Sequence, residues 1–146
     1  MTDPTESEAR LVVRPLSLDD LEAIQEIQHR CFPDLVPWSE ENLKNHLATF
    51  PEGQIGIELD GKLVASSSSL ILDSTKWKDK HTFEQICPRG YLSNHDPEGN
   101  LLYGIDIVVD PDARGMRLAR RIYEARMELV EELELRKIVI AGRIPG

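Results

Sequence analysis

The stretch VVDPDARGMRLARRIY, residues 108–123, joins the end of an apolar strand to the start of a long helix. Asp110-Pro111 is a turn signal that separates the two elements. Gly115 stands just ahead of the helix, where a residue without a side chain lets the backbone approach a ligand closely. Backbone N–H groups at a helix N-terminus bind anions, because the helix dipole reinforces them. This segment therefore predicts a phosphate-binding turn.

Four arginines crowd into eight residues at the same place: Arg114, Arg117, Arg120 and Arg121. Guanidinium groups pair with phosphate through bidentate hydrogen bonds, so these arginines could neutralise a diphosphate. The other interpretation is a solvated, arginine-rich helix start that binds no ligand. Composition alone does not separate a phosphate-binding turn from a bare helix end.

Five segments, including the apolar strand that ends in this stretch, have the residue pattern of strands: 11–15, 54–59, 62–72, 101–109 and 138–141. The run at 101–109 is almost continuously apolar, as in a central strand that is buried on both faces. Asp60-Gly61 predicts a tight hairpin turn between two of the strands.

Helical periodicity predicts three helices. The first is capped by Ser17 and stops near Pro33, and the second is capped by Ser39. The third carries apolar residues along one side: Leu118, Ile122, Ala125, Leu129 and Leu133. The order of elements predicts an α/β (α+β) fold, a mixed β-sheet flanked by helices with antiparallel hairpins and one parallel crossover.

The segment 73–100 is polar and contains only a weak helical signal around 82–86. A loop-rich connection of this length inside a domain is often functional. His95 lies in it without metal-ligand spacing, so we expect no metal site. His46 is expected at the surface or at the cap of the second helix.

The 146 residues suit one domain, because domains typically have about 100–150 residues. The formal net charge of −9 argues against general nucleic-acid binding, since phosphate contacts dominate that affinity. No run approaches the roughly 18 apolar residues of a membrane span. We expect residues 1–9 to be a polar, flexible tail, and they do not have the pattern of a secretory signal. Cys31 and Cys87 lack paired spacing, as in reduced cytosolic proteins. We therefore expect a cytoplasmic protein with neither nucleic acid nor membrane as a partner.

Residues 108–123 resemble the cofactor motif of the GNAT superfamily, the acyl-CoA-dependent N-acyltransferases. In that family a strand ending in V-x-P precedes Arg or Gln, two residues, Gly, one residue, then Gly or Ala. Val109 and Pro111 take the strand-end positions, Arg114 the first motif position and Ala119 the last. The order of elements between residues 12 and 141 also matches, including the opening VRPLSLDDLEAI.

The sequence also resembles a narrower group of proteins. Three segments carry this resemblance: RGMRLARRIYEAR, LYGIDIVVDP and RKIVIAGRIPG. The group comprises N-terminal GNAT-like domains of bacterial proteins that continue into a carbon–nitrogen hydrolase domain. The hydrolase domain is absent from these residues, so its activity does not carry over. In the family fold a helix and two strands follow the last strand found here. We therefore expect residues 10–146 to be the N-terminal part of a longer acyl-CoA-binding domain. The sheet edge that these residues leave unpaired favours a homo-oligomer.

The resemblance implies acetyl-CoA, or another acyl-CoA, as cosubstrate. Its pantetheine arm would lie along the main chain of Ile107, Val108 and Val109. Its pyrophosphate would lie on the amides of one turn: Arg114, Gly115, Met116, Arg117, Leu118, Ala119 and Arg120. Arg117 stands where the family has its middle glycine. It would either crowd the cofactor or bind a phosphate through its own guanidinium.

The reaction implied is direct attack of an amine, on a small molecule or a protein, on the thioester carbonyl. Asp106 is the implied base or anchor for the amine, because several family members carry an acid at this strand position. The other interpretation is a carboxylate tied into local hydrogen bonds. The family's usual acid, a tyrosine on a later helix, has no counterpart here. Two functions stay open: an N-acetyltransferase, or a non-catalytic acyl-CoA-binding, regulatory or docking module of a larger carbon–nitrogen hydrolase protein.

Overall fold

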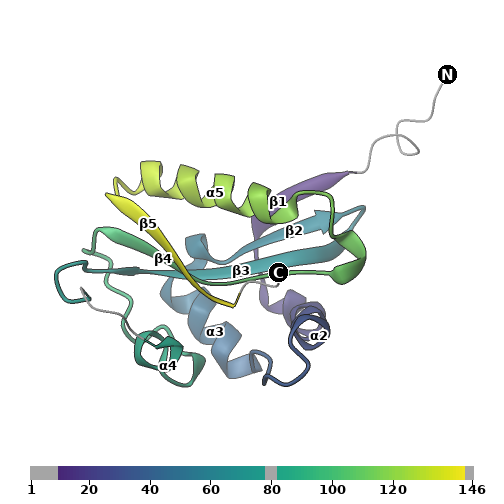
Figure 1. Cartoon of the computed structure of the whole chain (residues 1–146), viewed down its shortest axis with the longest axis horizontal. Helices are drawn as coiled ribbons and strands as arrows, with labels where there is room; N and C mark the ends of the chain where they lie inside the picture. Colours follow the sequence, from purple (N-terminus) through teal and green to yellow (C-terminus); the bar gives the residue numbers. More distant parts are fainter. Residues whose placement is uncertain (1–9, 78–81, 144–146) are drawn as a thin grey trace.

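The computed structural model describes residues 10–77 and 82–143, which form a twisted sheet between two layers of helices (Figure 1). The sheet has five strands in chain order: β1 (Leu11–Pro15), β2 (Ile55–Leu59), β3 (Lys62–Leu72), β4 (Leu101–Val109) and β5 (Lys137–Arg143). Neighbours from β1 to β4 are antiparallel, and β5 joins β4 in parallel. The predicted mixed sheet with one parallel crossover is confirmed.

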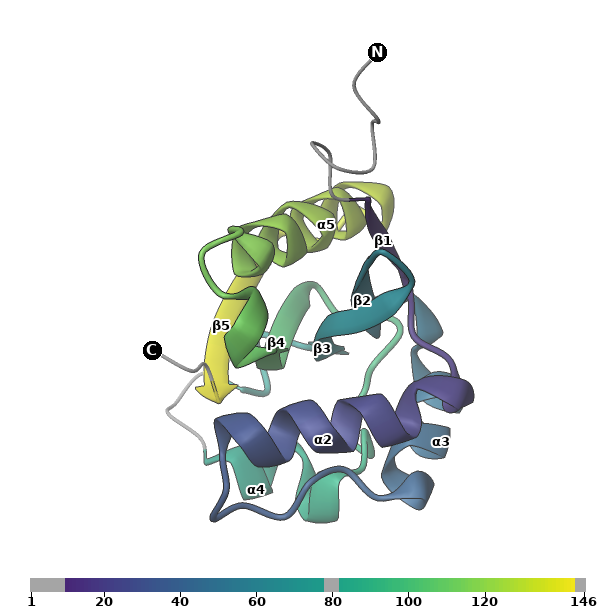
Figure 2. The same ribbon diagram turned by 90° about the vertical axis from the view of Figure 1, so that its right-hand side faces the viewer.

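Helices cover both faces of the sheet (Figures 1 and 2). One face carries α2 (Leu21–Cys31) and α3 (Glu40–Thr49), and the other carries α5 (Leu118–Glu132). Ser39 caps α3 as predicted, with its hydroxyl accepting a 3.0 Å hydrogen bond from the Asn42 N–H. Ser17 instead precedes a single 3-10 turn, η1 (Leu18–Asp20), that leads into α2. Within the described ranges, no helix has the length and apolar character of a membrane span.

The buried side of α5 differs from the predicted one at three positions: Arg126, Val130 and Leu133. Leu133 follows the last helical residue and is 37% exposed, because the chain has already turned toward β5. Val130 and Arg126 face the sheet beside the predicted Ile122 and Leu129. An arginine therefore occupies a core position on this helix.

The hairpin between β2 and β3 confirms the prediction from Asp60-Gly61. Both residues have positive φ, 52° and 85°. Two consecutive left-handed residues form the turn whose twist matches the flanking strands.

The described part of the connection between β3 and β4 packs on the same side of the sheet as α3 (Figures 1 and 2). It contains α4 (Phe83–Ile86) and a 3-10 turn, η3 (Pro88–Gly90). β2 pairs with β3 only as far as Ser67. Beyond it, the Ile71 N–H donates to His95 Nδ1 at 3.0 Å and the Asp96 N–H donates to Ile71 O at 2.8 Å. The loop therefore forms hydrogen bonds with the part of β3 that extends beyond its pairing with β2.

Candidate functional site

The predicted phosphate turn lies between the end of β4 and the start of α5. A 3-10 turn, η4 (Pro111–Ala113), follows Asp110, whose carboxylate accepts a 2.9 Å hydrogen bond from the Asp112 N–H. Gly115 has φ +96°, and no atom lies within 4 Å of the place where a Cβ would be. Glycine is therefore favoured at position 115 by the positive φ and not by a lack of space for a side chain. The turn opens to solvent directly ahead of the first N–H groups of α5, which have no intrahelical acceptor.

Arg117 is the residue before α5 and has φ +57° and ψ +37°. This is the left-handed region, which glycine adopts without steric cost. The position that resembles the family's middle glycine therefore has a backbone that suits glycine. The Arg117 side chain is exposed, as are those of Arg114, Arg120 and Arg121. The structure thus gathers the predicted cations around the start of α5.

Residues at the C-terminal end of α2 form ion pairs and hydrogen bonds with this turn. Arg30 forms ion pairs with Asp110 at 2.8 Å and with Asp112 at 3.1 Å. The half-buried Cys31 donates from Sγ to Val109 O at 3.2 Å, and Arg114 Nη2 lies 3.6 Å from the same sulfur. Sequence reasoning missed Arg30, since a contact across 80 residues leaves no local signal.

A β-bulge interrupts β4 at Ile105. Ser68 pairs with Asp106 and Ser69 pairs with Gly104, so Ile105 has no register partner on β3. Pairing with β5 also shifts between Gly104 and Asp106, and Asp106–Arg143 is its last described pair. Val108 and Val109 therefore lie beyond the described pairing with β5. A bulge bends a strand and re-aims its side chains, and such bulges are frequent beside active sites.

Asp106 is 3% exposed, and its carboxylate lies on the α2 and α3 face of the sheet. Its Oδ2 accepts hydrogen bonds from Trp38 Nε1 at 3.1 Å and Gln28 Nε2 at 3.5 Å. The Trp38 N–H in turn donates to Gln28 Oε1 at 2.8 Å. The corner between α2 and α3 therefore covers the carboxylate. These contacts agree with the interpretation of Asp106 as a hydrogen-bonded residue, and its catalytic role stays a prediction.

His46 closes the outer side of this cluster and corrects an expectation. It is 1% exposed rather than at the surface, because the segment after α4 packs on α3. Its Nε2 lies 2.7 Å from Gly90 O, and its ring meets the Trp38 ring edge-on at 4.9 Å. Burial lowers the pKa of His46, which favours the neutral imidazole at neutral pH.

Arg126 lies on the opposite face of the sheet, against the bulge. It is completely buried, and its Nη2 donates to Ser68 O at 3.0 Å and to Asp106 O at 2.9 Å. Burial lowers the pKa of Arg126, and the negative charge of Asp106 opposes that shift. Sequence reasoning missed this residue, although an arginine four residues after Ile122 and four before Val130 was a usable signal.

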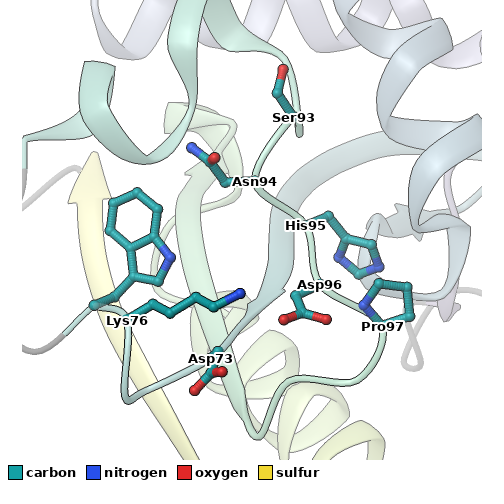
Figure 3. A pocket seen from close by; sticks show the side chains of 8 residues that line it. Asp73, Lys76, Ser93, Asn94, His95, Asp96 and Pro97 are labelled. Carbon is teal, nitrogen blue, oxygen red and sulfur yellow. The ribbon is translucent and has the colours of Figure 1, made fainter.

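A hollow lies at the other end of β4, in the connection that follows β3 (Figure 3). Its volume is about 530 Å³. Its lining mixes both charges with amide and aromatic groups: Asp73, Lys76, Trp77, Ser93, Asn94, His95, Asp96 and Pro97. His95 uses Nδ1 to accept from Ile71 and stacks on Phe50 at 4.7 Å, so it serves the packing of the loop. The phosphate turn and this hollow stand at opposite ends of the strand.

Known proteins share both the sequence pattern and the fold. The family model described as "Acetyltransferase (GNAT) family" matches residues 21–144. The "Probable hydrolase YhcX" of Bacillus subtilis (strain 168) is 41% identical over 99% of this chain and 28% of that protein. The "Uncharacterized N-acetyltransferase YkwB" of the same organism is 33% identical over 92% of this chain and 62% of that protein. The chain thus spans less than two thirds of either relative.

Two solved structures have the same fold. The loading GNATL domain of CurA from Lyngbya majuscula matches with a TM-score of 0.75 at 20% identity, over 90% of this chain and 64% of that one. The GphF GNAT-like decarboxylase in complex with isobutyryl-CoA matches with a TM-score of 0.61 at 21% identity, over 77% and 55%. At such identities the likeness concerns the fold alone. The family model, however, matches most of the sequence, and the chain belongs to the GNAT acetyltransferase family.

Proposed function

We propose that the chain binds an acyl-CoA, with acetyl-CoA as the expected cosubstrate, and transfers the acyl group to an amine. The observation that carries this proposal is the continuity of two features. The end of β4 beyond its described pairing with β5 leads directly into the open, arginine-rich turn at the start of α5. The pantetheine of an acyl-CoA is an extended arm that ends in a diphosphate. The arm can lie along a strand edge, and the diphosphate can bind at the helix N-terminus that follows it.

The diphosphate would lie on the turn from Arg114 to Arg120. Gly115 and Arg117, both with positive φ, turn the chain directly ahead of the first amides of α5. The exposed guanidinium groups of this turn would add charge-assisted hydrogen bonds to phosphate oxygens. The pantetheine arm would follow the main chain of Ile107, Val108 and Val109 toward the bulge.

Asp106 would act where the thioester meets the amine. The attacking nitrogen must be neutral, so a group has to accept the proton of the ammonium form. A carboxylate next to the bulge can anchor the ammonium and take that proton, directly or through a water. Trp38 and Gln28, at the corner between α2 and α3, cover the Asp106 carboxylate. For Asp106 to act as the base, this corner must either admit the amine or relay the proton of the amine to the carboxylate.

An amine-dependent assay of CoA release tests the transfer. Wild-type chain and acetyl-CoA are mixed with a panel of small amines and peptide N-termini, and free thiol is measured over time. Asp106→Asn keeps the shape and acceptor oxygen of the side chain but loses the base, so we expect the rate to fall roughly 100-fold. Asp60→Asn, in the β2–β3 hairpin, is the control and should keep the wild-type rate. Binding of acetyl-CoA without release by any amine would instead support the acyl-CoA-binding module.

A further inference from the structure

Asp106 is held from both faces of the sheet. On one face its carboxylate accepts from Trp38 Nε1 at 3.1 Å. On the other face its main-chain carbonyl accepts from Arg126 Nη2 at 2.9 Å, and the same nitrogen reaches Ser68 O at 3.0 Å. Ser68 and Asp106 are register partners at the bulge. Arg126 therefore bridges β3 and β4 at the place where their pairing is irregular.

The direction of the Asp106 carbonyl follows from the strand beyond the bulge. The Asp110 N–H donates to Val64 O on β3 at 2.7 Å. Main-chain groups of alternate residues in a strand face the same neighbour, so Asp106, four residues earlier, also faces β3. Gln54 Nε2 donates to Ser69 O from the β2 side, so the Ser68 carbonyl faces β4. The guanidinium thus binds two carbonyls that converge on it and fixes the peptide plane of Asp106.

Burial of the Arg126 guanidinium is energetically unfavourable in a way that burial of an apolar side chain would not be. Arg126 Nε and Nη1 have no hydrogen-bond partner among the described residues, and a buried donor without a partner is unfavourable. A Cβ at position 104 would lie 2.4 Å from Nη1, so Gly104 leaves room for the guanidinium. An apolar side chain of similar length would fill this place without leaving donors unpaired.

We propose that Arg126 is a positioning residue for Asp106. By holding the bulge from the α5 face, it sets where the carboxylate lies beneath Trp38, and so where the amine is bound and deprotonated. The link to catalysis rests on the proposed acyl transfer, whereas the link between Arg126 and the Asp106–Trp38 contact does not.

The first test uses the Trp38 indole as a reporter. The chain has two tryptophans, so Trp77→Phe leaves Trp38 as the only indole N–H signal in a proton–nitrogen NMR spectrum. In this background, Arg126→Met should move the signal upfield and speed its hydrogen exchange at least about tenfold, since the bond to Asp106 weakens. Arg126→Lys should give an intermediate shift. Arg136→Met, at an exposed position after α5, should leave the signal in place.

Gly104→Ala keeps the proposal testable if Arg126→Met does not fold. The added methyl displaces the guanidinium while leaving its charge, so the indole signal should move in the same direction. Thermal unfolding of each variant shows which of them are folded. An indole signal that stays at the wild-type position in folded Arg126→Met or Gly104→Ala would overturn the proposal.

The second test separates positioning from cofactor binding. Acetyl-CoA affinity, measured by calorimetry, should stay within about threefold in Arg126→Met, because the phosphate turn is elsewhere. Amine-dependent CoA release should fall roughly ten- to hundred-fold and recover in part with Arg126→Lys. Unchanged release by Arg126→Met overturns the inference and leaves the proposed function standing. If the wild type releases no CoA with any amine, the proposed function fails, and the indole signal alone decides the role of Arg126.

Discussion

Arg117 has a backbone conformation that is unusual for an arginine. It is one of four non-glycine residues with positive φ among the described residues: Asp60, Arg89, Arg117 and Glu134. The left-handed region costs a side-chain-bearing residue about 1–2 kcal/mol. Its side chain is exposed, so burial does not account for the strain at the very position where the family has glycine. A strained residue beside a candidate ligand site points to a functional reason for it.

Arg117→Gly should therefore raise the free energy of unfolding by about 0.5–1 kcal/mol, since relief of strain exceeds the added entropy of the unfolded chain. Urea unfolding measures this change. Glu134→Gly is the matched control and should stabilise similarly, since Glu134 has φ +55° and lies two residues after the end of α5. We expect only Arg117→Gly to weaken acetyl-CoA binding, because only Arg117 can reach a phosphate. Tighter binding would mean that Arg117 crowds the cofactor instead.

Gly115→Glu should weaken acyl-CoA binding about ten- to hundred-fold, the equivalent of about 1.5–3 kcal/mol for a lost charge-assisted contact. The glutamate places negative charge where the amides are proposed to meet the pyrophosphate. Gly61→Glu is the control, because Gly61 also has positive φ and no atom within 4 Å of the place where a Cβ would be. It adds the same charge and strain outside the proposed site. Equal affinity of Gly115→Glu and Gly61→Glu would exclude the placement.

Among the elements, α2 contributes most to the geometry of the turn. Arg30, at its last turn, joins it to Asp110, whose side chain is only 4% exposed. Lys62 approaches the same carboxylate at 3.9 Å from β3. The turn is therefore held by a helix that lies 80 residues earlier in the sequence. Any ligand of the turn should depend on this contact.

Arg30→Met should lower the free energy of unfolding, because the buried Asp110 loses its ion pair with the guanidinium. Amide hydrogen exchange in residues 110–117 should become faster, and acetyl-CoA affinity should fall several-fold. Lys44→Met provides the comparison, since its pair with Glu40 at 3.7 Å is solvent-exposed and contributes less than about 0.5 kcal/mol. Similar effects of the two variants on the turn would contradict the account of the anchor.

The packing of α3 against the β3–β4 connection predicts a pH dependence. Burial lowers the pKa of both His46 and His95 below the ordinary value of about 6.5. Between the folded and unfolded pKa values, the unfolded state binds more protons, so stability is lost as pH falls below about 6.5. Urea unfolding at pH 7 and pH 5.5 should show this loss. His46→Gln should reduce it, and a loss unchanged in His46→Gln would contradict the role of that residue.

Across the whole molecule, periodicity predicted the sheet and helices because each element buries one face or both. β4 is apolar along most of its length, and the spacing of Leu118, Ile122 and Leu129 describes a helix that covers it. The same reasoning could not find Arg30 or the Trp38 contact with Asp106. Those contacts join positions 68 to 82 residues apart, and only the folded chain brings them together. Arg126 is different, since its place in an apolar period could have been noticed from sequence.

At the scale of the whole molecule, a CoA thioester is proposed to bind along β4 with its diphosphate on the turn before α5. Calorimetric titration of the chain with acetyl-CoA, CoA and ATP tests it most directly. We predict one site for acetyl-CoA and CoA, and binding of ATP at least about tenfold weaker, because ATP has no arm to lie along β4. Equal affinity for CoA and ATP, or no binding of any of the three, would contradict the account.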